Sequence, residues 1–182
     1  MFFLRKSNTE QLPVLMSGVR MGERTLQIGI DDSSLAGAIA AKVGLSGHAA
    51  IAVGDDDTAA KARAAAAASG ALVDVQVTSW DSLPFPADAF DAIILHAGGE
   101  ALPPLDSAAA VAMLREGHRV LRTGGRLVVF EGGPRPGVGA WFRSRQQPRH
   151  LEAAVGTLGA AGFRTARMLA EREGYRFTEG LK

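Results

Sequence analysis

Short apolar runs alternate with longer stretches of helical spacing along most of the chain. Five runs rich in Val, Ile, Leu and Ala predict buried strands at residues 24–30, 49–54, 71–77, 90–96 and 125–131. Helical patterns lie at residues 33–44, 57–69, 106–122 and 148–162. This alternation is typical of a parallel sheet that is covered by helices on both faces. We therefore predict an α/β fold, with residues 1–182 forming a single domain.

Proline, glycine and acidic residues mark the boundaries of these elements. Leu83-Pro84-Phe85-Pro86 predicts a loop, because proline lacks a backbone donor and restricts the residue before it. Asp106 is the predicted N-cap of the helix that follows it, and Gly124-Gly125 its predicted end. The acidic run at 55–57 indicates a helix N-terminus, since three consecutive side chains on a turn cannot all point at one metal ion. We predict no metal site.

Two further strand-like runs stand beyond the last helical pattern. Residues 163–171 and 175–181 flank Glu173-Gly174, and two runs so close in sequence can pair only as an antiparallel hairpin. An otherwise parallel sheet that ends in an antiparallel hairpin is a restricted topology.

The turn after the first strand carries the most informative residues. Gly29 follows the buried strand, and Asp31 and Ser33 stand at the next two alternate positions, before an alanine-rich helix. In nucleotide-binding α/β folds a ligand and the helix amides approach each other closely at this turn, which favours glycine. Gly29 therefore marks a predicted binding site in which one glycine of three is kept.

Four stretches follow one another along the chain: Leu26-Gln-Ile-Gly29, the run from Leu83 to Asp91, the run from Leu114 through Gly124-Gly125 to Leu127, and Ala161-Gly-Phe-Arg164. In this order they resemble class I S-adenosylmethionine-dependent methyltransferases, particularly the small-molecule branch that includes quinone-biosynthesis methyltransferases. The resemblance implies a Rossmann-like, doubly wound sheet of seven strands in the order 3-2-1-4-5-7-6, with strand 7 antiparallel. It also implies S-adenosylmethionine as cofactor and a small molecule as substrate.

The resemblance assigns contacts with the methionine part of the cofactor to four positions, which are Gln27, Gly29, Asp31 and Ser33. Gln27 stands two before Gly29, where the family has an acidic residue that holds the cofactor's ammonium. Asp31 and Ser33 stand at the family's second and third glycines. A carboxylate at position 31 either repels the carboxylate of the cofactor or takes over the ammonium in place of Gln27.

Contacts with the ribose and adenine are implied in the same way. The acidic residue that accepts the ribose hydroxyls corresponds to Val53 when the sequences are matched without gaps. A two-residue shift, which preserves the facing of side chains along a strand, brings Asp55 there instead. The position that faces the adenine amino group corresponds to Ser79, which Trp80 follows.

Two functions from different classes are consistent with these residues. The first is an S-adenosylmethionine-dependent enzyme that methylates an unidentified small molecule by direct displacement. The second is a non-catalytic methyltransferase-fold protein that has lost normal cofactor binding and acts as a binding or interaction module. A hydrogen bond to a charged group contributes roughly 1.5 to 3 kcal/mol. Losing the ammonium and ribose partners would therefore weaken binding by about a hundredfold or more.

Two candidates lie outside the cofactor motif. His96 ends the predicted fourth strand, where open α/β sheets place ligands, so it is either a general base or a polar residue that closes the strand. The Gly/Pro-rich, basic segment 132–150 is predicted to face a substrate or a protein partner, or to be a linker anchored by its aromatic residues. Its candidate contact residues are Trp141, Phe142, Arg143 and Arg145.

Composition narrows the partners and the setting. The chain has 182 residues, and 20 Lys and Arg balance 19 Asp and Glu, so no basic field indicates nucleic acid. The absence of cysteine excludes disulfides and thiolate nucleophiles and suits the cytoplasm. No apolar run predicts a membrane span. Residues 1–21 are predicted to be an N-terminal extension or a helix that covers the cofactor cleft, and the oligomeric state is left open.

Overall fold

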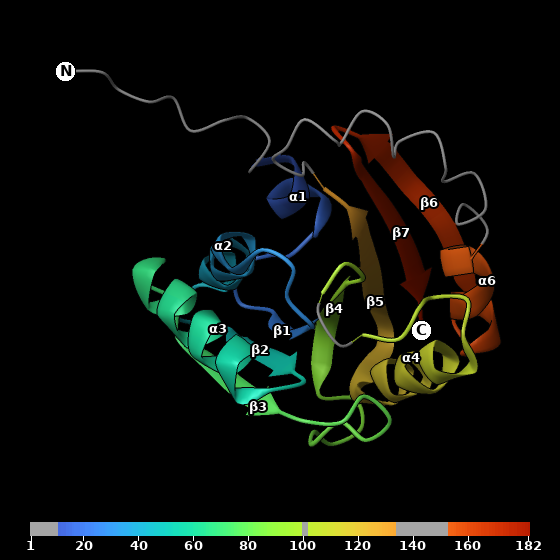
Figure 1. Cartoon of the computed structure of the whole chain (residues 1–182), viewed down its shortest axis with the longest axis horizontal. Coiled ribbons are helices and arrows are strands. Elements are labelled where there is room, and N and C mark those ends of the chain that lie inside the picture. The colour runs from blue at the N-terminus through green and yellow to red at the C-terminus, as the bar shows by residue number, and fades with distance from the viewer. Residues whose placement is uncertain (1–10, 100–101, 134–152) are drawn as a thin grey trace.

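A seven-stranded sheet with helices on both faces organises the chain (Figure 1). The computed structural model describes residues 11–99, 102–133 and 153–182. The strands are β1 Arg24–Ile28, β2 His48–Val53, β3 Val73–Val77, β4 Phe90–His96, β5 Leu121–Gly132, β6 Thr165–Arg172 and β7 Tyr175–Leu181. The helices are α1 Gln11–Met16, α2 Ser33–Val43, α3 Asp56–Ala68, α4 Ala108–Val120 and α6 Ala153–Ala160.

The strand order is β3-β2-β1-β4-β5-β7-β6, which confirms the predicted order. Strands β1 to β5 pair in parallel where they are neighbours, and β7 runs antiparallel to both β5 and β6. The hairpin between β6 and β7 turns at Glu173 and Gly174, which both have positive φ and which the sequence places between the two runs. Strand β1 ends two residues earlier than predicted, because Gly29 turns the chain at a φ of 70°.

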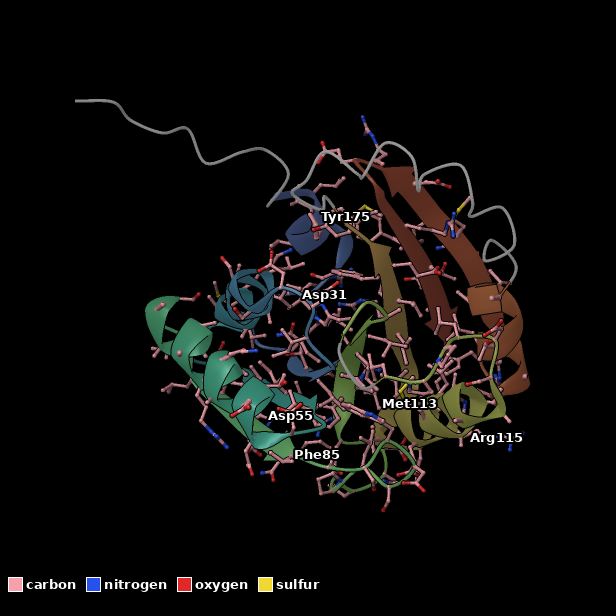
Figure 2. All side chains as sticks on the ribbon, viewed as in Figure 1. Asp31, Asp55, Phe85, Met113, Arg115 and Tyr175 are labelled. Carbon is pink, nitrogen blue, oxygen red and sulfur yellow. The ribbon has the colours of Figure 1, made fainter. Side chains whose placement is uncertain are left out.

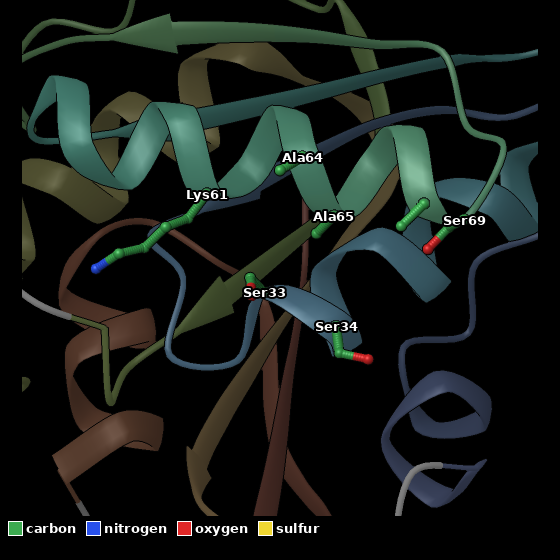
Figure 3. A pocket seen from close by; sticks show the side chains of 7 residues that line it. Ser33, Ser34, Lys61, Ala64, Ala65 and Ser69 are labelled. Atoms are coloured by element: carbon green, nitrogen blue, oxygen red, sulfur yellow. The ribbon is translucent and has the colours of Figure 1, made fainter.

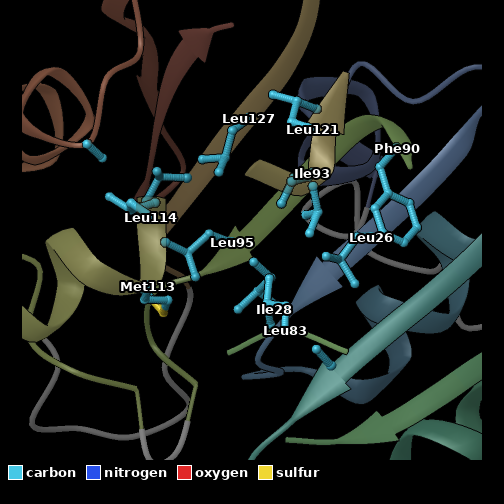
Figure 4. Packing of buried hydrophobic residues seen from close by; sticks show 14 of the residues in the cluster. Leu26, Ile28, Leu83, Phe90, Ile93, Leu95, Met113, Leu114, Leu121 and Leu127 are labelled. Carbon is cyan, nitrogen blue, oxygen red and sulfur yellow. The ribbon is translucent and has the colours of Figure 1, made fainter. Parts of the chain in front are cut away.

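The helices on each face bury a separate core. On one face, α4 and α6 pack against a cluster that includes Leu26, Ile93 and Leu127 (Figure 4). On the other face, α1, α2 and α3 cover two clusters, around Ile39 and Ile51. The segment between β3 and β4 contains no helix, which confirms the predicted loop at 83–86.

Side chains at the helix starts decide where two helices begin. Asp55 caps α3 by accepting a hydrogen bond from the Thr58 amide at 2.7 Å, so the acidic run at 55–57 is confirmed as a helix start. The predicted N-cap of α4 is wrong by one residue. Ser107, rather than Asp106, accepts from the Ala110 amide at 3.1 Å.

The predicted end of α4 is also wrong. The helix ends at Val120, and β5 begins at Leu121, before Gly124 and Gly125. The physical reason is that Leu121 is fully buried and pairs with Phe90 of β4, so the chain leaves the helix early to join the sheet. Gly124 then adopts a φ of 72° where the register between β4 and β5 shifts.

Helix α1 packs beside α2, and the Lys42 Nζ donates to the Val14 carbonyl at 3.2 Å. The further role of residues 1–21 as a cover for the cleft stays a prediction, and residues 1–10 lie outside the described residues. Within the described parts of the chain, no helix has the length and apolar character that a membrane span requires.

Candidate functional site

The residues around the β1–α2 turn enclose a cavity where the carboxyl ends of β1, β2 and β4 meet. Its volume is about 220 Å³, and it is lined by Ile30, Asp31, Ser33, Thr58, Lys61 and Gly98. In Figure 2, Asp31 lies between α2 and the sheet, and Asp55 lies at the start of α3. The carboxyl edge of an open α/β sheet is where this class of fold binds its ligands, so this cavity is the candidate site.

The loop after β4 closes over the β1–α2 turn. A β-carbon placed on Gly29 would lie 2.6 Å from the Cδ1 of Leu102 and 3.5 Å from the carbonyl oxygen of His96. A β-carbon on Gly98 would lie 3.2 Å from the Oδ2 of Asp31. Leu102 therefore covers the glycine that the sequence marked as the point of close ligand approach.

Three predicted site residues form one hydrogen-bonded chain beneath the cavity. The Nε2 of His96 lies 2.9 Å from the Oε1 of Gln27, and its Nδ1 lies 3.2 Å from the Oδ1 of Asp31. The Nε2 of Gln27 donates to the carbonyl of Ala36 at 2.9 Å. His96 is fully buried and Gln27 is 1% exposed. The ring of His96 does not reach solvent in this structure, and both of its nitrogens have hydrogen-bond partners. A role for His96 as general base stays a prediction.

Of the three hydrogen-bonded residues, Asp31 is the one that lines the cavity. Its backbone is exposed, but its carboxylate side chain keeps only 19% of its accessible surface. Burial alone would raise the pKa of Asp31, but the hydrogen bond and charge of His96, together with the backbone amides of Asp31 and Asp32, outweigh it and hold the pKa below its usual value. The carboxylate is therefore negatively charged at neutral pH.

Ser33 and Lys61 connect this cavity with a second, more open hollow. That hollow, of about 380 Å³, lies between α2 and α3 and is lined mainly by alanine and serine (Figure 3). The N-terminus of α2 is itself capped, because the Oδ1 of Asp32 accepts from the amides of Ser34 and Leu35. Because Lys61 lines both the cavity and the hollow, it supplies a positive charge to each.

The structure separates the two residues considered for the ribose contact. Val53 is fully buried in the cluster under α2 and α3 and pairs with Val77 of β3. Asp55 stays at the surface, where its two carboxylate oxygens accept from the amide and the hydroxyl of Thr58. Thr58 also lines the cavity, so Asp55 lies near its edge.

Ser79 and Trp80 do not line the cavity. Ser79 is exposed, and its carbonyl accepts from the Thr78 hydroxyl at 3.1 Å. Trp80 packs against the core on the α4 side of the sheet. Trp141, Phe142, Arg143 and Arg145 lie outside the described residues.

Sequence patterns did not identify Thr58, Lys61 or Leu102 as site residues. The single lysine in the alanine-rich first half of α3 was the available signal for Lys61. Leu102 had no signal, because its place over Gly29 depends on how the loop after β4 folds back. Over the part of the chain that the structure describes, no three side chains of metal-binding type gather in one place.

Known proteins resemble this chain in sequence and in fold. Residues 26–129 match a family described as a methyltransferase domain. The chain is 33% identical over 124 residues to a ubiquinone/menaquinone biosynthesis C-methyltransferase of Teredinibacter turnerae. That match covers 67% of this chain and 48% of the relative, so the chain spans about half the length of the curated relative that it matches.

Solved structures share the fold at low sequence identity. A SAM-dependent methyltransferase from Aquifex aeolicus superposes with a TM-score of 0.69 at 18% identity, over 95% of this chain and 88% of that one. PigF with SAH superposes with a TM-score of 0.61 at 20% identity, over 88% of this chain and 51% of that one. These two likenesses concern the fold.

Proposed function

Because the chain belongs to the family of class I S-adenosylmethionine-dependent methyltransferases, we propose that it binds S-adenosylmethionine at the cavity beside Asp31 and methylates a small molecule. The observation that carries this proposal is the pairing of opposite charges on one cavity, the Asp31 carboxylate and the Lys61 ammonium. An amino acid headgroup carries the complementary pair, an ammonium and a carboxylate.

The charged residues of the cavity fit the cofactor of this family. Asp31 would hold the ammonium, in place of the acidic residue that the family has at the position of Gln27. Lys61 would hold the carboxylate, and Asp55 at the cavity edge would accept from a ribose hydroxyl with the lone pairs that Thr58 leaves available. The cofactor would supply an electrophilic methyl group for direct transfer to the acceptor. This assignment favours the second of the two roles that the sequence left open for Asp31.

The volume fits less well than the charges. The cavity of about 220 Å³ is smaller than the roughly 300 to 1,000 Å³ of typical ligand sites. Leu102 covers Gly29, where the ligand is expected to pass close to the backbone. Binding would therefore require Leu102 to leave Gly29, and the cost of that movement would lower the apparent affinity.

The packing of Leu102 over Gly29 is also the observation that favours the second candidate function. A loop that stays packed on Gly29 would leave a non-catalytic methyltransferase-fold protein that acts as a binding or interaction module. Contacts with a protein partner through Trp141, Phe142, Arg143 and Arg145 belong to this alternative. A cytoplasmic location, and the lack of nucleic acid or membrane partners, are part of both proposals.

Thermal unfolding with S-adenosylhomocysteine distinguishes the two candidates. For the enzyme, ligand at about 100 times its Kd stabilises the folded state by about 2.7 kcal/mol, which raises Tm by roughly 5 to 10 °C. Asp31→Asn should reduce this rise, while Asp74→Asn, an exposed carboxylate on β3, should leave it unchanged.

A second variant tests the role of the loop. Leu102→Ala removes the side chain that covers Gly29, so we expect it to bind S-adenosylhomocysteine several-fold more tightly than the wild type in calorimetry. Leu72→Ala is the matched control, because Leu72 is 80% exposed and does not line the cavity. If neither the wild type nor Leu102→Ala responds to millimolar ligand, the enzyme proposal is wrong and the interaction-module proposal remains.

A further inference from the structure

The donors and acceptors around His96 determine how many protons its ring carries. The Ala36 carbonyl can only accept, so the hydrogen bond from Gln27 to Ala36 requires the amide nitrogen of Gln27 at that end. The Oε1 of Gln27 then faces the Nε2 of His96 at 2.9 Å, and this ring nitrogen must donate.

The other ring nitrogen faces a second acceptor. The Asp31 carboxylate is ionised at neutral pH and can only accept, and its Oδ1 lies 3.2 Å from the Nδ1 of His96. A neutral imidazole has one N–H and one lone pair, so it would place that lone pair against an oxygen of Gln27 or of Asp31. Only a ring that is protonated on both nitrogens satisfies both neighbours.

The strands on either side bring uncharged groups to the ring of His96. On β1 the neighbour is the neutral Gln27, and on β5 it is the ring of Phe130, whose centroid is 5.5 Å away. Asp31 in the β1–α2 turn is the charged group that faces His96 among the described residues. The hydrogen-bond geometry thus places a proton of His96 against the Asp31 carboxylate.

We propose that His96 is a positioning residue whose Nδ1–H donates a hydrogen bond to the Asp31 carboxylate in the free protein. When the ligand binds, its ammonium takes the place of this proton as the donor to Asp31. The proposal rests on the proposed function, because Asp31 is the residue assigned to the ligand's ammonium. On binding, the Nδ1 proton leaves to solvent by way of the partly exposed Asp31 carboxylate, and an N–H of the ammonium donates to that carboxylate in its place. The neutral ring keeps its Nε2 proton on Gln27, and its Nδ1 lone pair then faces a positive group. Cofactor binding and the protonation of His96 thereby exclude each other.

The first test concerns the free protein. In two-bond ¹⁵N–¹H correlation spectra at neutral pH, His96 should show two protonated nitrogens. Asp31→Asn should convert its signals to those of a ring with one proton, because an asparagine amide can donate to Nδ1. Asp74→Asn should leave the spectrum of the wild type unchanged. A His96 ring that is neutral in the wild type would overturn the proposal.

The second test concerns the coupling. Calorimetry with S-adenosylhomocysteine, in buffers of different ionisation enthalpy, should show the release of about one proton per ligand at a pH where the spectra show the doubly protonated ring. Affinity should rise by up to about tenfold per pH unit until the ring of the free protein is neutral. His96→Gln should bind the ligand without proton release and with a flat profile between pH 6 and 8.

The outcomes separate this coupling from the function on which it rests. Binding without proton release would overturn the coupling and leave the methyltransferase proposal standing. The absence of any binding would remove both. If His96→Gln does not fold, the spectra of Asp31→Asn and the proton count of the wild type still decide.

Discussion

Gln27, Asp31 and His96 lie on separate segments of the sequence and meet beneath one cavity. Each was identified from the sequence as a candidate, two by their positions around Gly29 and one by its place at the end of a strand. The contacts between them were not predictable from that, because 65 residues separate Asp31 from His96. A substitution at one of the three therefore alters the hydrogen bonding of the others, and none can be interpreted alone.

Asp31 also contributes to stability in a way that depends on pH. Because its folded-state pKa is lowered, its contribution is present above the unfolded pKa of about 4 and is lost as pH falls through the folded value. At pH 7 we expect Asp31→Asn to lower the free energy of unfolding by about 1 to 3 kcal/mol. Urea unfolding at several pH values should show the variant and the wild type converging below about pH 4. A gap that is equally large in acid would contradict this assignment.

At the scale of elements, α2 and α3 approach each other at Gly37 more closely than a side chain at that position would allow. A β-carbon on Gly37 of α2 would lie 2.6 Å from the carbonyl oxygen of Ala65 in α3. The alanine-rich sequence of α3 permits this contact, and the two helices together form the wall of the cavity that carries Ser33, Thr58 and Lys61. Their separation thus determines the width of the candidate site.

A pair of glycine substitutions tests this contact. Alanine in a helix interior is favoured over glycine by about 0.5 to 1 kcal/mol, but overpacking against a backbone atom costs about 1 to 3 kcal/mol. We expect Gly37→Ala to lower the free energy of unfolding by about 1 kcal/mol, because the clash outweighs the gain in propensity. Gly156→Ala in α6 meets nothing within 4 Å and should stabilise by the full propensity difference. Denaturant titration of both variants measures the contrast, and equal effects would show that α2 can shift freely.

At the scale of the whole molecule, the charged side chains at the two edges of the parallel strands have different surroundings. The carboxyl edge holds the cavity, whereas ion pairs join the strands near their amino ends. Arg126 of β5 pairs with Glu23, at 2.8 Å, and also donates to the Gly18 carbonyl. Asp91 of β4 pairs with both Arg24 and Arg122. The Glu23–Arg126 and Arg24–Asp91 pairs hold the start of β1 and the residues before it against the centre of the sheet, at the edge opposite the cavity.

The Glu23–Arg126 pair is expected to be worth more than a surface ion pair. Both side chains are less than one fifth exposed. Burial acts to raise the pKa of Glu23, but the hydrogen bonds from Arg126 and the Arg20 amide, together with the two arginine charges, outweigh it and lower the pKa. Glu23→Gln should lower the free energy of unfolding at pH 7 by roughly 1.5 to 3 kcal/mol. This loss should disappear as pH falls below about 4, where the carboxylate of the unfolded state is also protonated.

Arg167→Gln is the control for this prediction. It breaks a pair with Glu179 in which Arg167 is 63% exposed, and such pairs contribute roughly 0 to 1 kcal/mol. Chemical denaturation at pH 7 and pH 3 would compare the two variants. Similar losses for both would mean that the tie between β5 and the chain before β1 adds nothing beyond an ordinary surface contact.

Local patterning was sufficient for the alternation of strands and helices, the loop at 83–86, the hairpin and the helix start at Asp55, because each depends on residues close in sequence. Resemblance to a family supplied the strand order. Competition between neighbours in space decided the rest. The pairing of Leu121 with Phe90 ended α4 early, and burial of Val53 left Asp55 at the surface. The contacts of His96 and the position of Leu102 over Gly29 depend on the packing of distant segments. Short stretches of sequence were therefore sufficient to predict the elements of the fold. The charge and the openness of the site are determined by tertiary contacts between those stretches.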